Sequence, residues 1–281
     1  MSVSLVLQGG GIRGWYTSGV LTALREENIE FRKVYGVSAG ALCAIPYISG
    51  QLSRKTAAAY VKNLRDRRFM SVGNLRRTGS YFGFDYMLEE LPRRLPFDYR
   101  TFFSSPVELE VGTTDLKTGR AVYFGKDELK KSLAPLKASC SLPFFANIVE
   151  YRDYALLDGG CVEPIPIDQP LRDGSEKNVI VLTRVGSYRE KRGSRLSDAM
   201  LSRKYGQYPN FVNSMERHFQ TYNREVDLCS RLERQGRAVV IRPRGRVGVR
   251  RYRDTERMMQ MYRMGIRDCR EKLPLIRRFV S

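Results

Sequence analysis

The sequence predicts a three-layer α/β fold with a mainly parallel central sheet. Residues 4–7 and 34–37 are short apolar runs typical of buried strands, and each is followed by a glycine-containing turn and a helical stretch. Later in the chain, 154–158 and 179–183 are further strands of the buried type. Strands that alternate with helices in this way favour a parallel sheet covered by helices.

The first strand leads into a glycine loop, Gly9-Gly10-Gly11, that is closed by Gly14. The loop fits the Gly-x-Gly-x-x-Gly pattern of dinucleotide sites, but the second strand ends in Ser38 where that fingerprint requires an acidic residue. A P-loop is excluded because no Lys-Ser or Lys-Thr follows the last glycine. Bare backbone N–H groups at a helix N-terminus favour negative charge, so we expect Gly9, Gly10 and Gly11 to form an oxyanion hole.

The second strand runs into Gly36-Val37-Ser38-Ala39-Gly40, a Gly-x-Ser-x-Gly sequence followed by an alanine-rich helix. This is the pattern of a nucleophile elbow, a sharp strand-to-helix turn that exposes a serine hydroxyl. Gly36 and Gly40 allow so tight a bend. Ser38 is therefore the candidate nucleophile, and the alternative is a serine that merely closes a βα loop.

Strand 154–158 ends in Asp158, which Gly159 and Gly160 follow. A strand-end aspartate commonly starts a turn. At the carboxyl edge of the sheet, where we also expect Ser38, Asp158 would take the serine proton directly. A carboxylate with a pKa of about 4 is a weak base for a hydroxyl, so the site must hold it within hydrogen-bond reach and partly desolvated.

The other expected elements carry less chemistry. We expect a helix at 53–69 and a hairpin of strands 107–113 and 121–124, and we assign Cys140 and the serines beside it to packing. After a basic loop at 187–197 that marks a linker, the remaining elements are a helix at 211–232, a strand at 238–241, and a helix at 254–273 capped by Asp254.

The net charge of +19 lies mostly in the last third of the chain. Residues 181–281 hold 25 basic and 10 acidic side chains, a net of +15, and six arginines crowd the loop 242–253. Such a surface favours nucleic acid, an anionic lipid surface or an acidic protein as partner. The alternative is a solvated face that keeps the protein soluble.

The cysteines and the apolar runs indicate the compartment. The five cysteines are scattered and show neither Cys-x-x-Cys nor metal-ligand spacing, so we expect neither a disulfide framework nor a zinc site. We also expect no signal peptide and no transmembrane helix. These features predict a cytoplasmic protein, with peripheral contact at the inner membrane surface as the variant that the basic charge favours.

The motifs fall in an order and spacing that resemble the bacterial patatin-like phospholipase family. They are residues 9–14, the elbow at 36–40, the segment 138–143 and Asp158-Gly159-Gly160. The similarity extends over nearly the whole length, because residues 203–218 and 239–265 resemble the C-terminal extension of one bacterial branch. The chain departs from the family pattern at Asn147, where a proline is expected.

This resemblance implies a patatin-like core at 1–185 and a basic C-terminal α/β extension at 186–281 packed on it. It implies a lipid acyl hydrolase of the phospholipase A or lysophospholipase type, a serine esterase with Ser38 as nucleophile and Asp158 as its partner in a dyad, and no metal or cofactor. A lipid ester is then the substrate, and nucleic acid is not expected. The resemblance assigns the oxyanion hole to Gly9, Gly10 and Gly11, and motif support to Gly14, Gly36, Gly40, Gly159 and Gly160.

Two rival interpretations remain. Ser38, Asp158 and His218 occur in the chain order of an α/β-hydrolase triad, although His218 falls beside the apolar stripe of its helix, a usual place for a boundary histidine. A non-enzymatic basic protein that binds nucleic acid or anionic membranes would explain the last third of the chain. It would leave the glycine loop and the elbow without a purpose.

Overall fold

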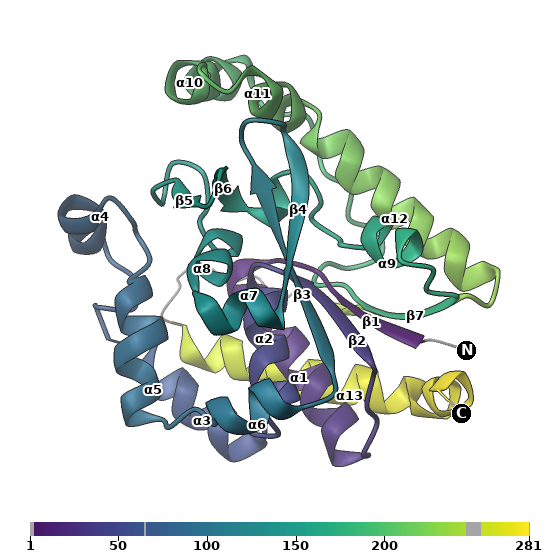
Figure 1. Cartoon of the computed structure of the whole chain (residues 1–281). Helices are drawn as coiled ribbons and strands as arrows, with labels where there is room; N and C mark the ends of the chain where they lie inside the picture. Colours follow the sequence, from purple (N-terminus) through teal and green to yellow (C-terminus); the bar gives the residue numbers. More distant parts are fainter. Residues whose placement is uncertain (1–2, 65, 246–253, 281) are drawn as a thin grey trace.

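The computed structural model describes residues 3–64, 66–245 and 254–280. One sheet runs through the molecule in the order β5-β6-β3-β2-β1-β7-β8, and β4 pairs with β3 (Figure 1). The pairs β3-β2, β2-β1, β1-β7 and β7-β8 are parallel, whereas β4, β5 and β6 pair antiparallel. The predicted α/β fold with a mainly parallel sheet is confirmed. The strands are β1 (Val3–Leu7), β2 (Lys33–Val37), β3 (Glu108–Asp115), β4 (Arg120–Gly125), β5 (Val149–Tyr151), β6 (Tyr154–Asp158), β7 (Lys177–Val181) and β8 (Ala238–Ile241).

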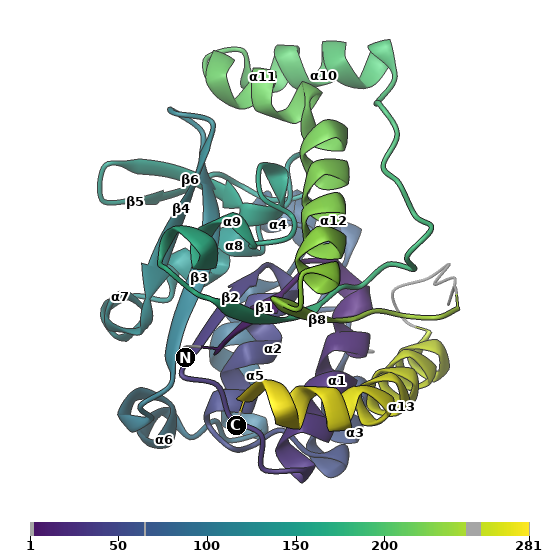
Figure 2. The same cartoon turned by 90° about the vertical axis from the view of Figure 1, so that its right-hand side faces the viewer.

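Helices cover both faces of this sheet, which gives the three layers. In β1, Leu5 and Leu7 pack with α1 and α13 on one face, while Val6 packs with α12 on the other. Figure 2 shows the sheet between these two groups of helices. The helices are α1 (Gly14–Glu26), α2 (Ala39–Ile48), α3 (Arg54–Asn63), α4 (Val72–Thr78), α5 (Leu91–Arg94), α6 (Tyr99–Ser104), α7 (Lys126–Lys131), α8 (Ala134–Ser139), α9 (Asp168–Arg172), α10 (Arg195–Tyr205), α11 (Pro209–Glu216), α12 (His218–Arg234) and α13 (Thr255–Val280), with a π-helical turn η2 (Tyr86–Glu90) and short 3-10 turns η1 (Gly11–Arg13) and η3 (Gly159–Cys161).

Several helix boundaries differ from the sequence-based expectation. The helix expected at 53–69 ends at Asn63, and the one expected at 211–232 is divided at Arg217 into α11 and α12. The basic loop expected at 187–197 is shorter, because α10 begins at Arg195 with Ser194 as its N-cap. The arginine-rich loop expected at 242–253 lies outside the described residues from position 246 onward.

The last helix, α13, is longer than expected. Asp254 Oδ1 accepts a hydrogen bond from the Arg257 amide, so the predicted N-cap is confirmed. The helix does not stop before Pro274 but continues to Val280, because Ile276 beyond the proline is fully buried in the core. Burial of that side chain offsets the hydrogen bond that proline cannot make.

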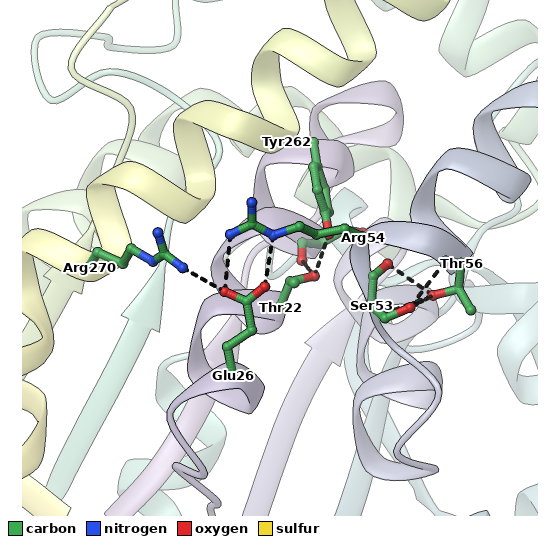
Figure 3. A network of polar contacts seen from close by, with 8 residues as sticks. Thr22, Glu26, Ser53, Arg54, Thr56, Tyr262 and Arg270 are labelled. Carbon is green, nitrogen blue, oxygen red and sulfur yellow. Dashed lines mark hydrogen bonds and ion pairs between the residues drawn. The ribbon is translucent and has the colours of Figure 1, made fainter.

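Glycines let α13 cross α1 at very close range. A Cβ atom on Gly19 would lie 2.0 Å from the Tyr262 carbonyl oxygen, and one on Gly265 would lie 2.1 Å from the Tyr16 carbonyl oxygen. Polar contacts flank this crossing: the Tyr262 hydroxyl donates to Thr22 Oγ1 at 2.9 Å. Figure 3 shows this bond beside the pairing of Glu26 with Arg54 and Arg270.

The predicted division at residue 185 stays a prediction. β7, which precedes it, pairs along its length with β8, which follows it, and α13 packs in the same core cluster as α1. All five cysteines are free. Within the described ranges, none of the helices has the length and apolar character needed to span a bilayer.

Candidate active site

Ser38 occupies the turn between β2 and α2 with φ 53° and ψ −126°, a backbone conformation that residues other than glycine rarely adopt. The chain around it leaves no room for side chains at the flanking positions. A Cβ atom on Gly36 would lie 2.7 Å from the Ala41 nitrogen, and one on Gly40 would lie 2.4 Å from the Leu7 carbonyl oxygen. The local geometry is that of a nucleophile elbow.

Asp158, the last residue of β6, faces the Ser38 hydroxyl. Ser38 Oγ donates a hydrogen bond to Asp158 Oδ2 at 2.7 Å, and the Gly160 amide donates one to Oδ1 at 2.7 Å. Burial raises the pKa of Asp158 from 3.8 to about 7, although both hydrogen bonds act to lower it. Such a carboxylate is a better proton acceptor at neutral pH than an ordinary aspartate.

Strand register, and not a shared carboxyl edge, brings these two residues together. β2 is parallel to β3, with Val37 opposite Gly112, but β6 is antiparallel to β3, with Asp158 opposite Thr113. The expected reason for their proximity is therefore wrong, because β6 runs in the opposite direction to β2. Strand β6 starts beside the carboxyl end of β3 and runs back along it to Asp158. Asp158 is opposite Thr113, the residue of β3 that follows the partner of Val37, the last residue of β2.

Two buried hydroxyl groups fix the backbone of this pair. Ser139 Oγ accepts a hydrogen bond from the Ser38 amide at 2.8 Å and donates one to the Gly112 carbonyl oxygen at 2.7 Å. Thr114 Oγ1 donates to the Asp158 carbonyl oxygen at 2.8 Å. These roles differ from the sequence-based expectation, which gives the serines beside Cys140 a packing role and Thr114 none. The available signal for Ser139 was its place in a segment that resembles the family.

The glycine loop lies against the nucleophile. A Cβ atom on Gly9 would lie 3.3 Å from Ser38 Cβ. The Gly9 amide donates to the Pro164 carbonyl oxygen at 3.3 Å, so its hydrogen is already engaged. In the part of the chain that the structure describes, the amides of Gly10 and Gly11 have no hydrogen-bond acceptor, and Gly11 borders the cavity beside Ser38. Gly10 and Gly11 are thus better placed than Gly9 to receive an oxyanion.

The remaining motif glycines serve close packing and one hydrogen bond. A Cβ atom on Gly14 would lie 2.8 Å from Ala39 Cβ, and one on Gly159 would lie 2.3 Å from the Gly112 carbonyl oxygen. Gly160 contributes its amide to the buried carboxylate. These contacts hold the start of α1 against the start of α2, and the end of β6 against β3.

An apolar cavity of about 290 Å³ opens beside Ser38. Its wall is formed by helices on the α1 side of the sheet, and nearly all of the lining side chains are aliphatic or aromatic. Representative lining residues are Trp15, Leu42, Phe84, Leu88, Phe102 and Leu136. A concave apolar site with a few polar groups at one end is the usual form of a binding site for a small apolar ligand.

His218, the first residue of α12, contacts the backbone of Gly160, two residues after Asp158. Its Nε2 atom is 3.0 Å from the Gly160 carbonyl oxygen, so the nitrogen that carries hydrogen points at the backbone. Among the described residues, no hydrogen bond joins His218 to Ser38 or Asp158. Nor do any three His, Cys, Asp or Glu side chains in these ranges gather into a metal-binding group.

Comparison with known proteins gives several similar chains. The uncharacterized protein YjjU of Escherichia coli is 27% identical over 188 residues, which cover 64% of this chain and 52% of that protein. The uncharacterized NTE family protein Rv1063c of Mycobacterium tuberculosis is 27% identical over 172 residues, which cover 59% of this chain and 44% of the relative. The chain thus spans about half the length of the curated relatives it matches.

Among solved structures, VipD from Legionella pneumophila matches with a TM-score of 0.45 and 12% identity, over 97% of this chain and 66% of that chain. A family model described as a domain of unknown function, DUF6363, matches residues 208–281. The model of the patatin-like phospholipases matches residues 5–171. That range is more than half of the chain and includes the glycine loop, the elbow and Asp158. The chain belongs to the patatin-like phospholipase family.

Proposed function

We propose that this protein is a lipid acyl hydrolase of the phospholipase A or lysophospholipase type, which cleaves carboxylic esters through a serine acyl-enzyme. One observation carries the proposal: the 2.7 Å hydrogen bond from Ser38 Oγ to a buried Asp158, at the wall of an apolar cavity. A nucleophile and a base within hydrogen-bond reach are the minimum for covalent acyl transfer. The cavity is of a kind that suits an acyl chain.

In the proposed mechanism, Ser38 Oγ attacks the ester carbonyl carbon and its proton passes to Asp158 Oδ2. The tetrahedral intermediate collapses to the acyl-enzyme, and the carboxyl group returns the proton to the leaving alcohol. Asp158 then takes a proton from a water molecule, which attacks the acyl-enzyme. As the second tetrahedral intermediate collapses, the bond to Ser38 Oγ breaks, Asp158 returns the proton to that oxygen, and the fatty acid is released. The pKa of about 7 supports both the acid and the base role at neutral pH.

The negative charge on the carbonyl oxygen requires hydrogen-bond donors. Of the expected oxyanion loop, we propose that the amides of Gly10 and Gly11 donate, and that Gly9 supports the loop through its bond to Pro164. Loss of one oxyanion donor typically lowers the rate by about 10²–10³. Ser139 acts as a positioning residue, because its hydroxyl holds the Ser38 amide.

Labelling with a fluorophosphonate probe, followed by a panel of phospholipids, lysophospholipids and simple esters, tests the proposal. The wild-type protein should label and hydrolyse at least one lipid ester, and Ser38→Ala should do neither. Ser49→Ala is the matched control, because Ser49 is also a buried serine, at the other end of α2. It should behave like the wild type.

A folded wild-type protein that neither labels at Ser38 nor hydrolyses any ester would overturn the proposal. A salt-dependent shift of DNA or RNA that persists in Ser38→Ala would instead support the non-enzymatic alternative.

A further inference from the structure

Large apolar side chains are exposed on three segments of the surface. Within the described residues, six large apolar side chains are more than 40% exposed, and four of them are Val72 on α4, Phe145 after α8, and Leu196 and Met200 on α10. Leu196 is 72% exposed. Figure 1 shows α4 and α10 standing out from the body of the molecule on the side where β5 and β6 lie.

Helix α10 is apolar on two opposite faces. Leu201 and Tyr205 lie on the inner face and are buried in a cluster with Phe211. Leu196 and Met200 are four residues apart, so they lie on one face, about 180° from Tyr205. Arg203 is exposed on the same outer face, whereas the Lys204 ammonium group lies over the rings of Phe144 and Tyr205, at 5.4 and 5.5 Å from their centroids. This face has no partner in the described chain, and it combines apolar and basic side chains.

Hydrogen bonds join the three segments through the loop 144–147. The Phe144 amide donates to Tyr205 Oη on α10 at 3.0 Å. On the other side, the Tyr81 amide donates to the Phe145 carbonyl oxygen at 2.6 Å, and Asn147 Nδ2 donates to the Thr78 carbonyl oxygen at the end of α4 at 2.7 Å. The expected proline at position 147 would lose this last bond, so Asn147 helps to hold the loop 144–147 against the end of α4.

The basic side chains of this surface differ from Arg270 and Arg277 on α13 in having no carboxylate partner. Arg270 and Arg277 on α13 pair with Glu26 and Glu27 of the core. In the described ranges, by contrast, no carboxylate lies within ion-pair distance of the exposed residues Arg76, Arg77, Arg203 and Lys204. The aromatic contacts of Lys204 do not neutralise its charge, so the four positive charges can attract an external anionic partner.

The surface also borders the cavity that contains Ser38. Leu142, two residues before Phe144, lines that cavity, and so does Phe82, which follows Tyr81. A lipid held at this surface would therefore be close in the chain to two residues of the cavity wall.

We propose that the docking surface, formed by Val72, Arg76, Arg77, Phe145, Leu196, Met200, Arg203 and Lys204, binds an anionic lipid bilayer. The apolar side chains enter the interface, and the four cations contact lipid phosphates and acidic headgroups. Docking on a bilayer would deliver a lipid to the cavity. Only this role of docking rests on the proposed function. Binding itself requires no catalysis.

Co-sedimentation with vesicles tests the inference. The wild-type protein should bind vesicles of equimolar phosphatidylcholine and phosphatidylglycerol more tightly than vesicles of phosphatidylcholine alone, and added salt should weaken the binding. Leu196→Gln/Met200→Gln should lower the affinity for the anionic vesicles about tenfold or more. Leu275→Gln is the matched control, because Leu275 is 44% exposed on α13, outside the docking surface. It should bind like the wild type.

A second pair of variants tests the charges. Arg203→Gln/Lys204→Gln should lower the affinity for anionic vesicles by roughly 30-fold, since each of the two basic residues near an anionic surface contributes about 1 kcal/mol. Arg263→Gln/Arg278→Gln removes the same charge from exposed positions of α13 and should leave binding within about threefold of the wild type. If the two pairs weaken binding equally, charge alone attracts the protein and the docking surface is wrong.

Hydrolysis separates this inference from the proposed function. The docking variants should cleave a soluble short-chain ester at the wild-type rate and lose activity only on vesicles. A protein that hydrolyses no ester but still binds vesicles through Leu196 would refute the proposed function and support docking. Equal vesicle binding by the wild type and Leu196→Gln/Met200→Gln would overturn docking whatever the activity. So would self-association through α10, detected as a dimer that this variant abolishes, without vesicle binding.

Discussion

Replacing Asp158 by asparagine should remove ester hydrolysis and, at the same time, stabilise the fold above neutral pH. The buried carboxyl group titrates at about 7 in the folded protein, against an ordinary value of 3.8, because burial disfavours the charged form. Asparagine is close in shape and carries no charge at any pH. The variant therefore loses both the base and the cost of ionising it in a buried site.

The sign and the size follow from linkage between protonation and folding. Below a pH of about 4 the carboxyl group is protonated in both the folded and the unfolded state, so it does not make the free energy of unfolding depend on pH. Between about pH 4 and pH 7 the unfolded chain releases the proton while the folded protein keeps it, so the wild-type free energy of unfolding falls as pH rises. A difference of about three pKa units corresponds to roughly 4 kcal/mol of unfolding free energy. The wild type has lost all of this amount above about pH 7. The Asp158→Asn variant has no carboxyl group at this position, so its free energy of unfolding does not fall in this way.

Urea unfolding at a series of pH values measures the effect. The difference in unfolding free energy between Asp158→Asn and the wild type should grow by up to about 4 kcal/mol from pH ~4 to pH ~8. Ser38→Ala serves as a second probe: it removes a hydrogen bond that lowers the pKa of Asp158, so its stability should keep falling to higher pH than that of the wild type. A difference between Asp158→Asn and the wild type that does not change with pH would refute the reasoning.

The other predictions concern the same site and the α1–α13 crossing. The wild-type kcat/KM for a soluble ester should rise about tenfold per pH unit up to about pH 7 and then level off, since Asp158 must be ionised to act as base; a flat profile over pH ~5–8 would contradict this. His218→Ala should keep hydrolysis within about tenfold, while Asp158→Asn should lose as much as Ser38→Ala; collapse of a folded His218→Ala enzyme would favour a triad instead. Gly265→Ala, whose Cβ would lie 2.1 Å from a backbone oxygen of α1, should lower the free energy of unfolding by about 1–3 kcal/mol or more. In the same urea assay Gly73→Ala, which has space on α4, should raise it by about 0.5–1 kcal/mol, and equal effects of the two would count against the close crossing.

The residues of the proposed dyad can be selected from sequence because their backbone surroundings demand glycine. Gly36 and Gly40 flank Ser38, and Gly159 follows Asp158, at points where any side chain would meet another chain segment. Such glycines leave a recognisable spacing. The direction of β6 cannot be predicted in this way, because a short apolar strand has the same residue pattern whether it pairs parallel or antiparallel. Sequence patterns therefore indicate the two residues that a hydrogen bond joins, but not the strand direction that brings them together.

The hydrogen bonds that support Ser38 and Asp158 could not be predicted from the sequence, for a different reason. Ser139 and Thr114 matter through single hydroxyl groups bonded to distant backbone atoms, and a lone serine or threonine has no sequence pattern that reveals such a partner. The end of α13 was misjudged because Pro274 is a strong local stop signal. Only the tertiary burial of Ile276, which local sequence does not encode, outweighs it.

The crossing of α1 and α13 also has a consequence for synthesis on the ribosome. The hydrogen-bonded pair Thr22 and Tyr262 is separated by 240 residues. At about 5–20 residues per second, α1 emerges roughly 12–50 s before its partner helix is made. During that interval the Gly19 face of α1, which begins where the glycine loop ends, has no helix to cover it. We therefore expect this nascent chain to depend on chaperones until α13 is made, and the glycine loop to be among the last parts to reach its final form.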